Sequence, residues 1–199
     1  MKQPDMEESL LRRSRDLAEC TGRFLETLEA LRVRGQKDVE TIWNAACHVN
    51  VVDHDISVFL YFVTTTEDVW ARRSVARAIA TLLYEAIEDL PALFGASFID
   101  ACTVAGVYRE VEGDFKATKK RLSEFSKQHH SFLKSIRRNA GAHKDHDAIE
   151  FITAVVQADD CKMVDLACQF SAILLELGRF SSVVIENVNT EYRKRGVIP

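Results

Sequence analysis

The stretch CKMVDLACQFSAILLELGRFSSVVIENVNTEY, residues 161–192, contains one glycine and no proline. Its apolar side chains recur every three or four residues, a spacing that places them on one face of an α-helix. The residues of this face are Val164, Leu166, Ala167, Phe170, Ile173, Leu174 and Leu177. The pattern predicts one long helix whose apolar face must be covered by other elements of the fold.

The rest of the chain has little that would interrupt helices. Only 8 Gly and 3 Pro occur among 199 residues, and Pro4, Pro91 and Pro199 lie near the ends or at an apparent break. Scarce glycine and proline favour long helices over a many-stranded sheet. The predicted fold is therefore all-α, with one domain over residues 1–199 that forms a single antiparallel bundle of about five to seven helices.

Two of the other predicted helices lie in the first third of the chain. Leucines at helical spacing predict a helix over residues 7–34, which Gly35 ends. Asp38 is predicted to cap a second helix. This second helix either continues to Phe62 or breaks around the Asp53-His54-Asp55 cluster, which we interpret as a kink or loop.

Three more helices are predicted before the carboxyl-terminal one. The sequence TTTED at residues 64–68 predicts a helix start, with a hydroxyl cap and acids in the first turn, and Pro91 marks the end of that helix. A shorter helix is predicted over residues 97–111. Another is predicted to start at Gly113 and to run through Ile136 towards residue 138.

The composition is that of an ordinary globular protein, with 47% hydrophobic and 28% charged residues. The amino-terminal MKQPDMEESLLRR has no long apolar run behind its charges, so no signal peptide is predicted. Residues 56–63 and 173–177 form the most apolar windows, and both are too short to cross a bilayer. The five cysteines are widely spaced among apolar residues and form no CxxC pair, which predicts buried, reduced thiols. These features predict a cytoplasmic protein that does not contact membranes.

Positive charge is concentrated in one segment of an acidic protein. The formal net charge is -4, yet residues 116–144 hold nine cations against the single acid Glu124 and so carry +8, which leaves -12 for the remainder. Screening limits the repulsion from distant acids to about 8 Å, so such a segment can still attract a polyanion. The alternative interpretation is a solvated helix face that acids on neighbouring helices neutralise.

The basic segment ends in Arg138-Asn139-Ala140-Gly141-Ala142-His143, followed by Lys144-Asp145. Arginine neutralises phosphate at any physiological pH, and histidine can move a proton near neutrality. On an ideal helix Asn139 and His143 lie about 40° apart, whereas Arg138 projects about 140° away from His143. The local geometry permits these three side chains to converge on a phosphate. A plain helix end, with Gly141 as its cap, is the structural alternative.

The pattern Arg-Asn-x-x-x-His, followed by a basic residue and Asp and placed late in a helical protein, resembles the signature of HEPN domains. Arg138, Asn139 and His143 match its specifying positions, and the likeness is best to stand-alone HEPN proteins of the toxin and abortive-infection kind. The resemblance implies a metal-independent endoribonuclease without cofactors, active at a homodimer interface. It also implies RNA as substrate and an antitoxin protein as a further candidate partner.

The resemblance assigns roles to the matching residues. His143 would act as general acid or base, Arg138 would stabilise the transition state, and Asn139 would orient the imidazole or bind the phosphate. Lys134, Arg137 and Lys144 are candidates for binding the RNA backbone. Some members of the family carry degraded motifs and serve as dimerisation or interaction modules, so a non-catalytic helical module that binds nucleotide, RNA or antitoxin is the alternative function.

A second cluster of cations, Arg72, Arg73 and Arg77, lies at helical spacing with Tyr84, Glu85 and Glu88 beyond it. A solvated helix face is the default interpretation. If this helix lies beside the motif, Arg73 or Arg77 would extend the phosphate-binding groove. The dipeptides His54-Asp55 and His146-Asp147 lack the further ligands of a metal-dependent phosphohydrolase, so no metal site is predicted.

Overall fold

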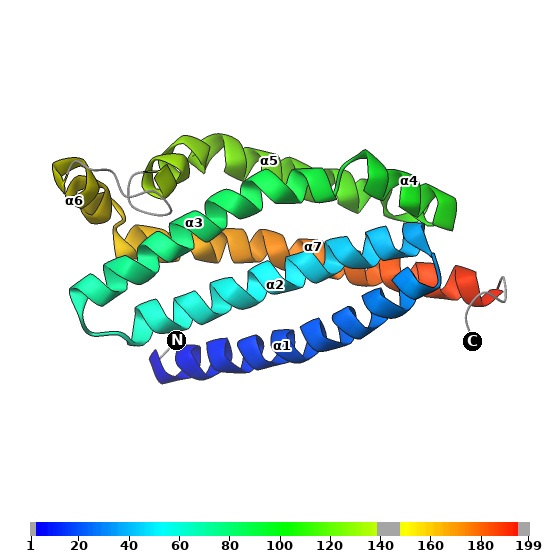
Figure 1. Ribbon diagram of the computed structural model, residues 1–199, viewed down its shortest axis with the longest axis horizontal. Coiled ribbons are helices and arrows are strands. Elements are labelled where there is room, and N and C mark those ends of the chain that lie inside the picture. Colours follow the sequence, from blue (N-terminus) through cyan, green and yellow to red (C-terminus); the bar gives the residue numbers. More distant parts are fainter. Residues whose placement is uncertain (1–2, 139–147, 195–199) are drawn as a thin grey trace.

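The computed structural model describes residues 3–138 and 148–194, which form seven α-helices and no strand (Figure 1). The helices are α1 (Gln3–Val33), α2 (Lys37–Thr65), α3 (Val69–Leu93), α4 (Ala96–Ala105), α5 (Tyr108–Ile136), α6 (Ala148–Gln157) and α7 (Asp160–Lys194). The predicted all-α bundle is confirmed. Helix α6 was not predicted, and it lies at the end of the bundle where α7 begins (Figure 1).

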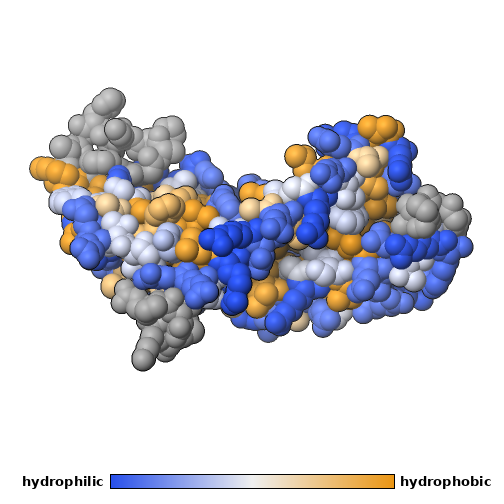
Figure 2. Space-filling model, turned by 90° about the horizontal axis from the view of Figure 1, so that it is seen from below, coloured by the Kyte–Doolittle hydropathy of each residue, from blue (hydrophilic) through white to orange (hydrophobic). Residues whose placement is uncertain are grey.

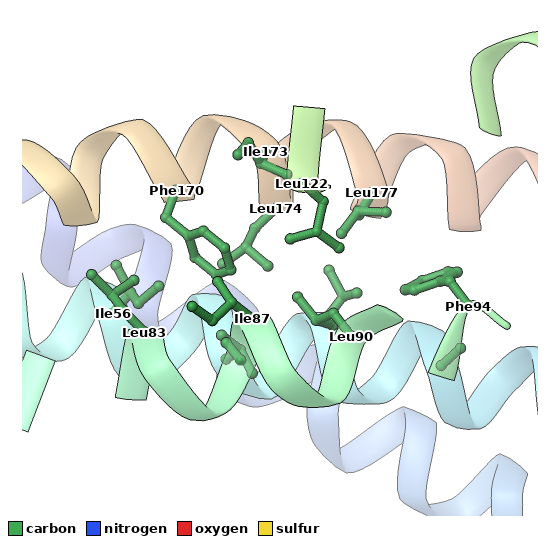
Figure 3. Packing of buried hydrophobic residues seen from close by; sticks show 14 of the residues in the cluster. Ile56, Leu83, Ile87, Leu90, Phe94, Leu122, Phe170, Ile173, Leu174 and Leu177 are labelled. Atoms are coloured by element: carbon green, nitrogen blue, oxygen red, sulfur yellow. The ribbon is translucent and has the colours of Figure 1, made fainter. Parts of the chain in front are cut away.

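The long helices run side by side, with α1 along one edge of the bundle and α5 along the opposite edge (Figure 1). Helix α2 packs against α1, α3, α4 and α7, whereas α1 packs against α2 alone among the described helices. One continuous apolar core joins α2, α3, α5 and α7. Figure 3 shows its centre, where Phe170 and Leu174 of α7 face Leu83 and Ile87 of α3. The apolar face predicted for residues 161–192 therefore lies in the core.

Helix α2 continues without a break through Asp53, so the interpretation of residues 53–55 as a kink or loop is wrong. Asp53 is buried and accepts two hydrogen bonds from Arg13 of α1, at 2.7 and 2.8 Å. Ser171 of α7 donates a third hydrogen bond to it, at 3.1 Å. A charged residue that looked like a solvated break is therefore the point where three helices are joined.

Several predicted helix ends lie elsewhere. Gln36 precedes α2 and makes no capping hydrogen bond with its side chain, so the cap predicted at Asp38 is wrong. Asp68 caps α3 by accepting from the backbone N–H of Ala71 at 2.7 Å. The threonine at residue 65 belongs to the last turn of α2, where its hydroxyl donates to the carbonyl of Tyr61. The prediction of a hydroxyl cap within residues 64–68 is therefore wrong, because the cap is the carboxylate of Asp68, the last residue of that sequence.

Helix α3 extends past Pro91 to Leu93, because a proline in the last turn disrupts a bond of the preceding turn only. Helix α4 ends at Ala105 and is capped by Gly106, whose φ of 85° is the left-handed conformation that closes many helices. Helix α5 then begins at Tyr108, so Gly113 is an interior residue and does not mark the helix start. The predicted helix over residues 97–111 is in fact two helices separated by a turn.

Helix α7 corrects the expectation about apolar windows, because it is long and apolar enough to cross a membrane by length and composition. In the most apolar 18-residue window of α7, 44% is buried within the bundle. The core helix of a soluble protein can be equally long and apolar. This burial is consistent with a soluble protein. The expectation of buried thiols holds for Cys102 alone, since Cys47 is half-buried and the other three cysteines, Cys20, Cys161 and Cys168, are exposed.

Candidate functional site

The sequence motif begins at the carboxyl-terminal end of α5. Beyond Ile136 the chain makes a π-helical turn at Arg137 and Arg138, and the side chain of Arg138 is exposed. A π turn spaces backbone hydrogen bonds five residues apart, and such turns are frequent at functional sites. The described part of this turn ends at Arg138. Asn139, His143 and Lys144 lie outside the described residues.

Arg137 holds the end of α5 against α3. Its guanidinium carbon lies 5.3 Å from the centre of the Tyr84 ring, and its Nη2 lies 3.5 Å from Oε1 of Glu85. The Arg137 side chain is 35% exposed. A guanidinium that stacks on an aromatic ring and pairs with a carboxylate is partly neutralised already. Of the two adjacent arginines, Arg138 is therefore the better placed to meet a phosphate, while Arg137 positions the helix end.

Helices α3 and α5 run antiparallel along this contact. His130, about two turns before Arg137, has its Nε2 3.1 Å from Oε1 of Glu88, and the centre of its ring lies 5.4 Å from the centre of the Tyr84 ring. Residues nearer the end of α5 therefore contact residues nearer the start of α3: His130 contacts Glu88, and Arg137 contacts Tyr84 and Glu85. The end of α5 consequently points towards the amino-terminal half of α3, which carries the second basic cluster.

Arg73 and Arg77 are on this half of α3, as a groove beside the motif requires. The guanidinium of Arg73 lies 5.2 Å from the centre of the Trp70 ring, and Nη2 of Arg77 donates to Ser74 at 3.1 Å. Lys134, one turn before Arg138 on α5, is exposed. The described members of the predicted phosphate-binding set therefore lie towards one end of the bundle.

The start of α7 closes the same end of the bundle. Nε of Arg72 lies 2.7 Å from Oδ2 of Asp160, which ties α3 to α7. Nζ of Lys162 lies 3.4 Å from the centre of the Phe132 ring of α5. Burial and, to a smaller extent, the charge of Lys162 lower the pKa of His129, so this imidazole favours the neutral form. Neutral His129 adds no charge to the basic segment.

Acids neutralise part of the basic segment. Four of its cations form ion pairs with carboxylates: Lys116 with Glu112 at 2.6 Å, Lys120 with Glu124 at 3.8 Å, Arg121 with Glu176, and Arg137 with Glu85. The interpretation as a helix face balanced by acids is therefore right for these positions. Lys119, Lys127, Lys134 and Arg138 have no ion pair with any described carboxylate. Except for Lys119, which lies 5.5 Å from the centre of the Phe115 ring, these cations lie in or just after the carboxyl-terminal half of α5.

One group in the described part of the chain has metal-ligand chemistry, although it was not predicted. Donor atoms of Asp159, Asp160 and Cys161 lie within 4.8 Å of one another at the start of α7. Asp160 already pairs with Arg72, and Asp159 accepts the backbone N–H of Lys162 at 2.8 Å as a helix cap. Both acids therefore have structural roles that explain their position without a metal ion.

Comparison with protein-family profiles, with curated proteins and with solved structures finds no match for this chain. The aromatic and acidic partners that position Arg137 and His130 were not assigned from the sequence, although Tyr84, Glu85 and Glu88 stood out there at helical spacing beyond the arginines of α3. In the sequence, the helical spacing of Tyr84, Glu85 and Glu88 was the signal that could have identified these partners. Their partners on α5 depend on how the two helices pack.

Proposed function

We propose that this chain is a metal-independent endoribonuclease of the HEPN type, a toxin or phage-defence effector that acts as a homodimer on RNA. The observation that carries the proposal is the sequence of residues 138–143 at the end of a basic helix in an all-α bundle. The exposed guanidinium of Arg138 and the unpaired Lys134 support it, because both are available to an anionic backbone.

In this proposal, His143 removes the proton of the ribose 2'-hydroxyl or protonates the leaving oxygen. Arg138 stabilises the negative charge that develops on the phosphorus-centred transition state, and Asn139 orients the imidazole or holds the phosphate. Lys134 and Lys144 bind flanking phosphates, and Arg73 and Arg77 extend this track along α3. Recognition by phosphate contacts alone gives affinity that falls steeply with salt and depends little on base sequence.

The test is cleavage of a labelled single-stranded RNA by the purified full chain in the presence of EDTA. We expect cleavage, and we expect Arg138→Ala and His143→Ala each to reduce its rate by about two orders of magnitude or more. Lys116→Ala is the matched control, because Lys116 is an exposed cation of α5 that already pairs with Glu112 and lies towards the opposite end of the helix from Arg138. This control should cleave RNA at the parental rate, and circular dichroism should show all three variants folded.

Three results would contradict the proposal. Loss of cleavage on chelation would indicate a metal-dependent hydrolase. Parental rates in Arg138→Ala and His143→Ala would show that the activity comes from elsewhere. Absence of cleavage on every RNA tried, with the chain folded and dimeric, would favour the non-catalytic interaction module instead.

A further inference from the structure

A long groove runs between α1 and α7 on the opposite side of the bundle from α5. No described Cα of α1 lies within 8 Å of a Cα of α7, although both helices pack against α2. Four adjoining cavities fill the space between them, with volumes of about 190 to 480 Å³. Figure 2, which views the molecule from the α1 side, shows apolar surface in patches between hydrophilic side chains.

The groove is continuous because neighbouring cavities share lining residues. We number the four cavities from the amino-terminal end of α1. Leu17 and Leu175 line the first and second cavities, and Phe24 lines the second and third. Trp43 of α2 lines the third and fourth and forms the floor. The Phe24 and Trp43 rings meet edge to face, with centres 5.4 Å apart. The middle of the groove is therefore aromatic and apolar.

Each wall contains a series of lining residues spaced three or four apart, among others that also line the cavities. On α1 the series is Leu17, Cys20, Phe24, Thr27 and Leu31. On α7 it is Leu175, Gly178, Ser182, Ile185, Asn189 and Tyr192. Residues separated alternately by three and four positions occupy the a and d positions of a coiled coil. Side chains at these positions on α1 and α7 could interlock with those of an additional helix placed in the groove. Small residues in these series, such as Gly178 and Ser182, leave space for large apolar side chains of that helix.

Cations exceed acids along the rims. Arg12, Arg23 and Arg34 each line a cavity. The spacing of eleven residues places Arg12 and Arg23 within about 20° of each other and about 16.5 Å apart along α1, and Arg34 follows the last residue of that helix. Arg179 adds a cation from α7. The acids that also line the groove are two unburied ones, Asp16 and Glu186, together with Asp53, which Arg13 neutralises.

Arg12, Arg34 and Arg179 form no ion pair with a described carboxylate, and Arg23 is 3.8 Å from exposed Glu19. The rim therefore carries unneutralised positive charge beside an apolar seam. This combination matches a helix with one apolar face flanked by acidic residues.

We propose that the α1–α7 groove binds an acidic amphipathic helix of a partner protein. The wall from Leu175 to Tyr192 is about 26 Å long at 1.5 Å per residue, which corresponds to a partner helix of about 18 residues. Apolar residues of the partner would fill the holes over Gly178 and Ser182, and its carboxylates would pair with the arginines of α1. The inference does not rest on the proposed nuclease activity, because Lys134 and Arg138, the described residues nearest that site, do not line the groove.

Gly178 provides a way to close the groove without disturbing the fold. A Cβ placed on Gly178 meets no atom within 4 Å, and the residue lies inside a helix. Leucine at this position would therefore project into the space that the partner helix occupies. Gly22 of α1 is the matched control, because it is also a helical glycine with open space around its Cβ, yet it lines none of the four cavities.

The experiment measures binding of two fluorescent peptides to the full chain by anisotropy. Each peptide has about three heptads with leucine at positions a and d, and the flanking e and g positions are all glutamate in one and all lysine in the other. We expect the glutamate peptide to bind and the lysine peptide to bind at least about tenfold more weakly. Gly178→Leu should weaken binding of the glutamate peptide about tenfold or more, and Gly22→Leu should leave it unchanged.

A double variant tests the charge separately from the shape. Arg12→Glu with Arg23→Glu should reverse the preference, so that the lysine peptide binds better than the glutamate peptide. The proposal is overturned if the glutamate peptide does not bind, if both peptides bind equally, or if Gly178→Leu and Gly22→Leu behave alike. It is also overturned if Gly178→Leu converts a dimer to a monomer in light scattering, because a second copy of the chain would then occupy the groove.

Discussion

Replacing Arg13 with alanine is expected to destabilise the bundle more than replacing Asp53, although the two residues form one ion pair. The Asp53 side chain is 10% exposed and the Arg13 side chain is 35% exposed. Arg13→Ala leaves a buried carboxylate, with the Ser171 hydroxyl as its remaining described side-chain donor. Asp53→Ala leaves a guanidinium that can turn into water.

The magnitudes follow from this difference in exposure. Removing one partner of a buried ion pair costs about 3–5 kcal/mol. Water can reach Asp53 once Arg13 is truncated, so we expect about 3 kcal/mol for Arg13→Ala. Asp53→Ala loses the hydrogen bonds from Arg13 and Ser171, for which we expect about 2 kcal/mol. The double variant should lose about 2–3 kcal/mol, well below the sum, because no uncompensated charge is left behind.

The assay is urea unfolding followed by circular dichroism, with the free energy of unfolding obtained by linear extrapolation. Arg15→Ala is the control, because Arg15 is an exposed arginine of the same helix and should change stability by less than about 0.5 kcal/mol. If Arg13→Ala is no more destabilising than Arg15→Ala, or if the double variant loses the sum of the single losses, the reasoning about the buried carboxylate is wrong.

Three further predictions concern the core and its edges. Burial raises the pKa of Cys102 to about 12, so iodoacetamide at about pH 8 should label exposed Cys20 within the time that leaves Cys102 unmodified, as read by peptide mass spectrometry. Burial and Lys162 lower the pKa of His129, so as the pH falls the imidazole is protonated in the unfolded chain before it is protonated in the folded one. The free energy of unfolding should therefore fall as the pH drops below about 6.5. Urea midpoints should show a smaller fall in His129→Gln. Gly106 has a φ of 85°, so Gly106→Ala should cost about 1–2 kcal/mol in thermal or urea unfolding, and an unchanged midpoint would contradict the strain argument.

The long helices were predictable because their sequences carry local signals. The residues that cover the core from α7 recur at helical spacing, and Gly35 ends α1 through a conformation that other residues adopt at a cost. Gly106 has the same kind of conformation, but the prediction of one helix over residues 97–111 ran through it. Helix boundaries depended on weaker signals. Several residue types near residues 64–68 can cap a helix, and the choice of Asp68 depends on where the chain turns to enter α3.

The break expected at residues 53–55 shows what local sequence lacks. A cluster of charged residues in an apolar helix indicates solvent when it is considered alone, because burying an isolated carboxylate is costly. The cost is offset here by Arg13, forty residues earlier, and by Ser171, more than a hundred residues later. Neither partner is identifiable from the residues next to Asp53.

The candidate site illustrates the same limit for charge. The excess of cations in residues 116–144 was visible in the sequence, but the pairing of Arg121 with Glu176 and of Arg137 with Glu85 depends on helix packing. Two adjacent arginines of the basic segment consequently have different surroundings. Arg137 is held by Tyr84 and Glu85 of α3, whereas Arg138 is exposed at the start of the motif.

The way α1 is attached connects the buried ion pair to the groove. Polar contacts help to fix α1 on α2: Arg13 pairs with Asp53, and Asn50 donates to the Leu17 carbonyl and the Thr21 hydroxyl, both at 2.7 Å. Directional bonds fix the position of α1 on α2 without requiring its apolar side chains to be fully covered. Leu17 and Phe24 can therefore line a groove and still belong to a well-placed helix. Weakening the ion pair should loosen one wall of the groove, so Arg13→Ala is also expected to weaken binding of the glutamate peptide.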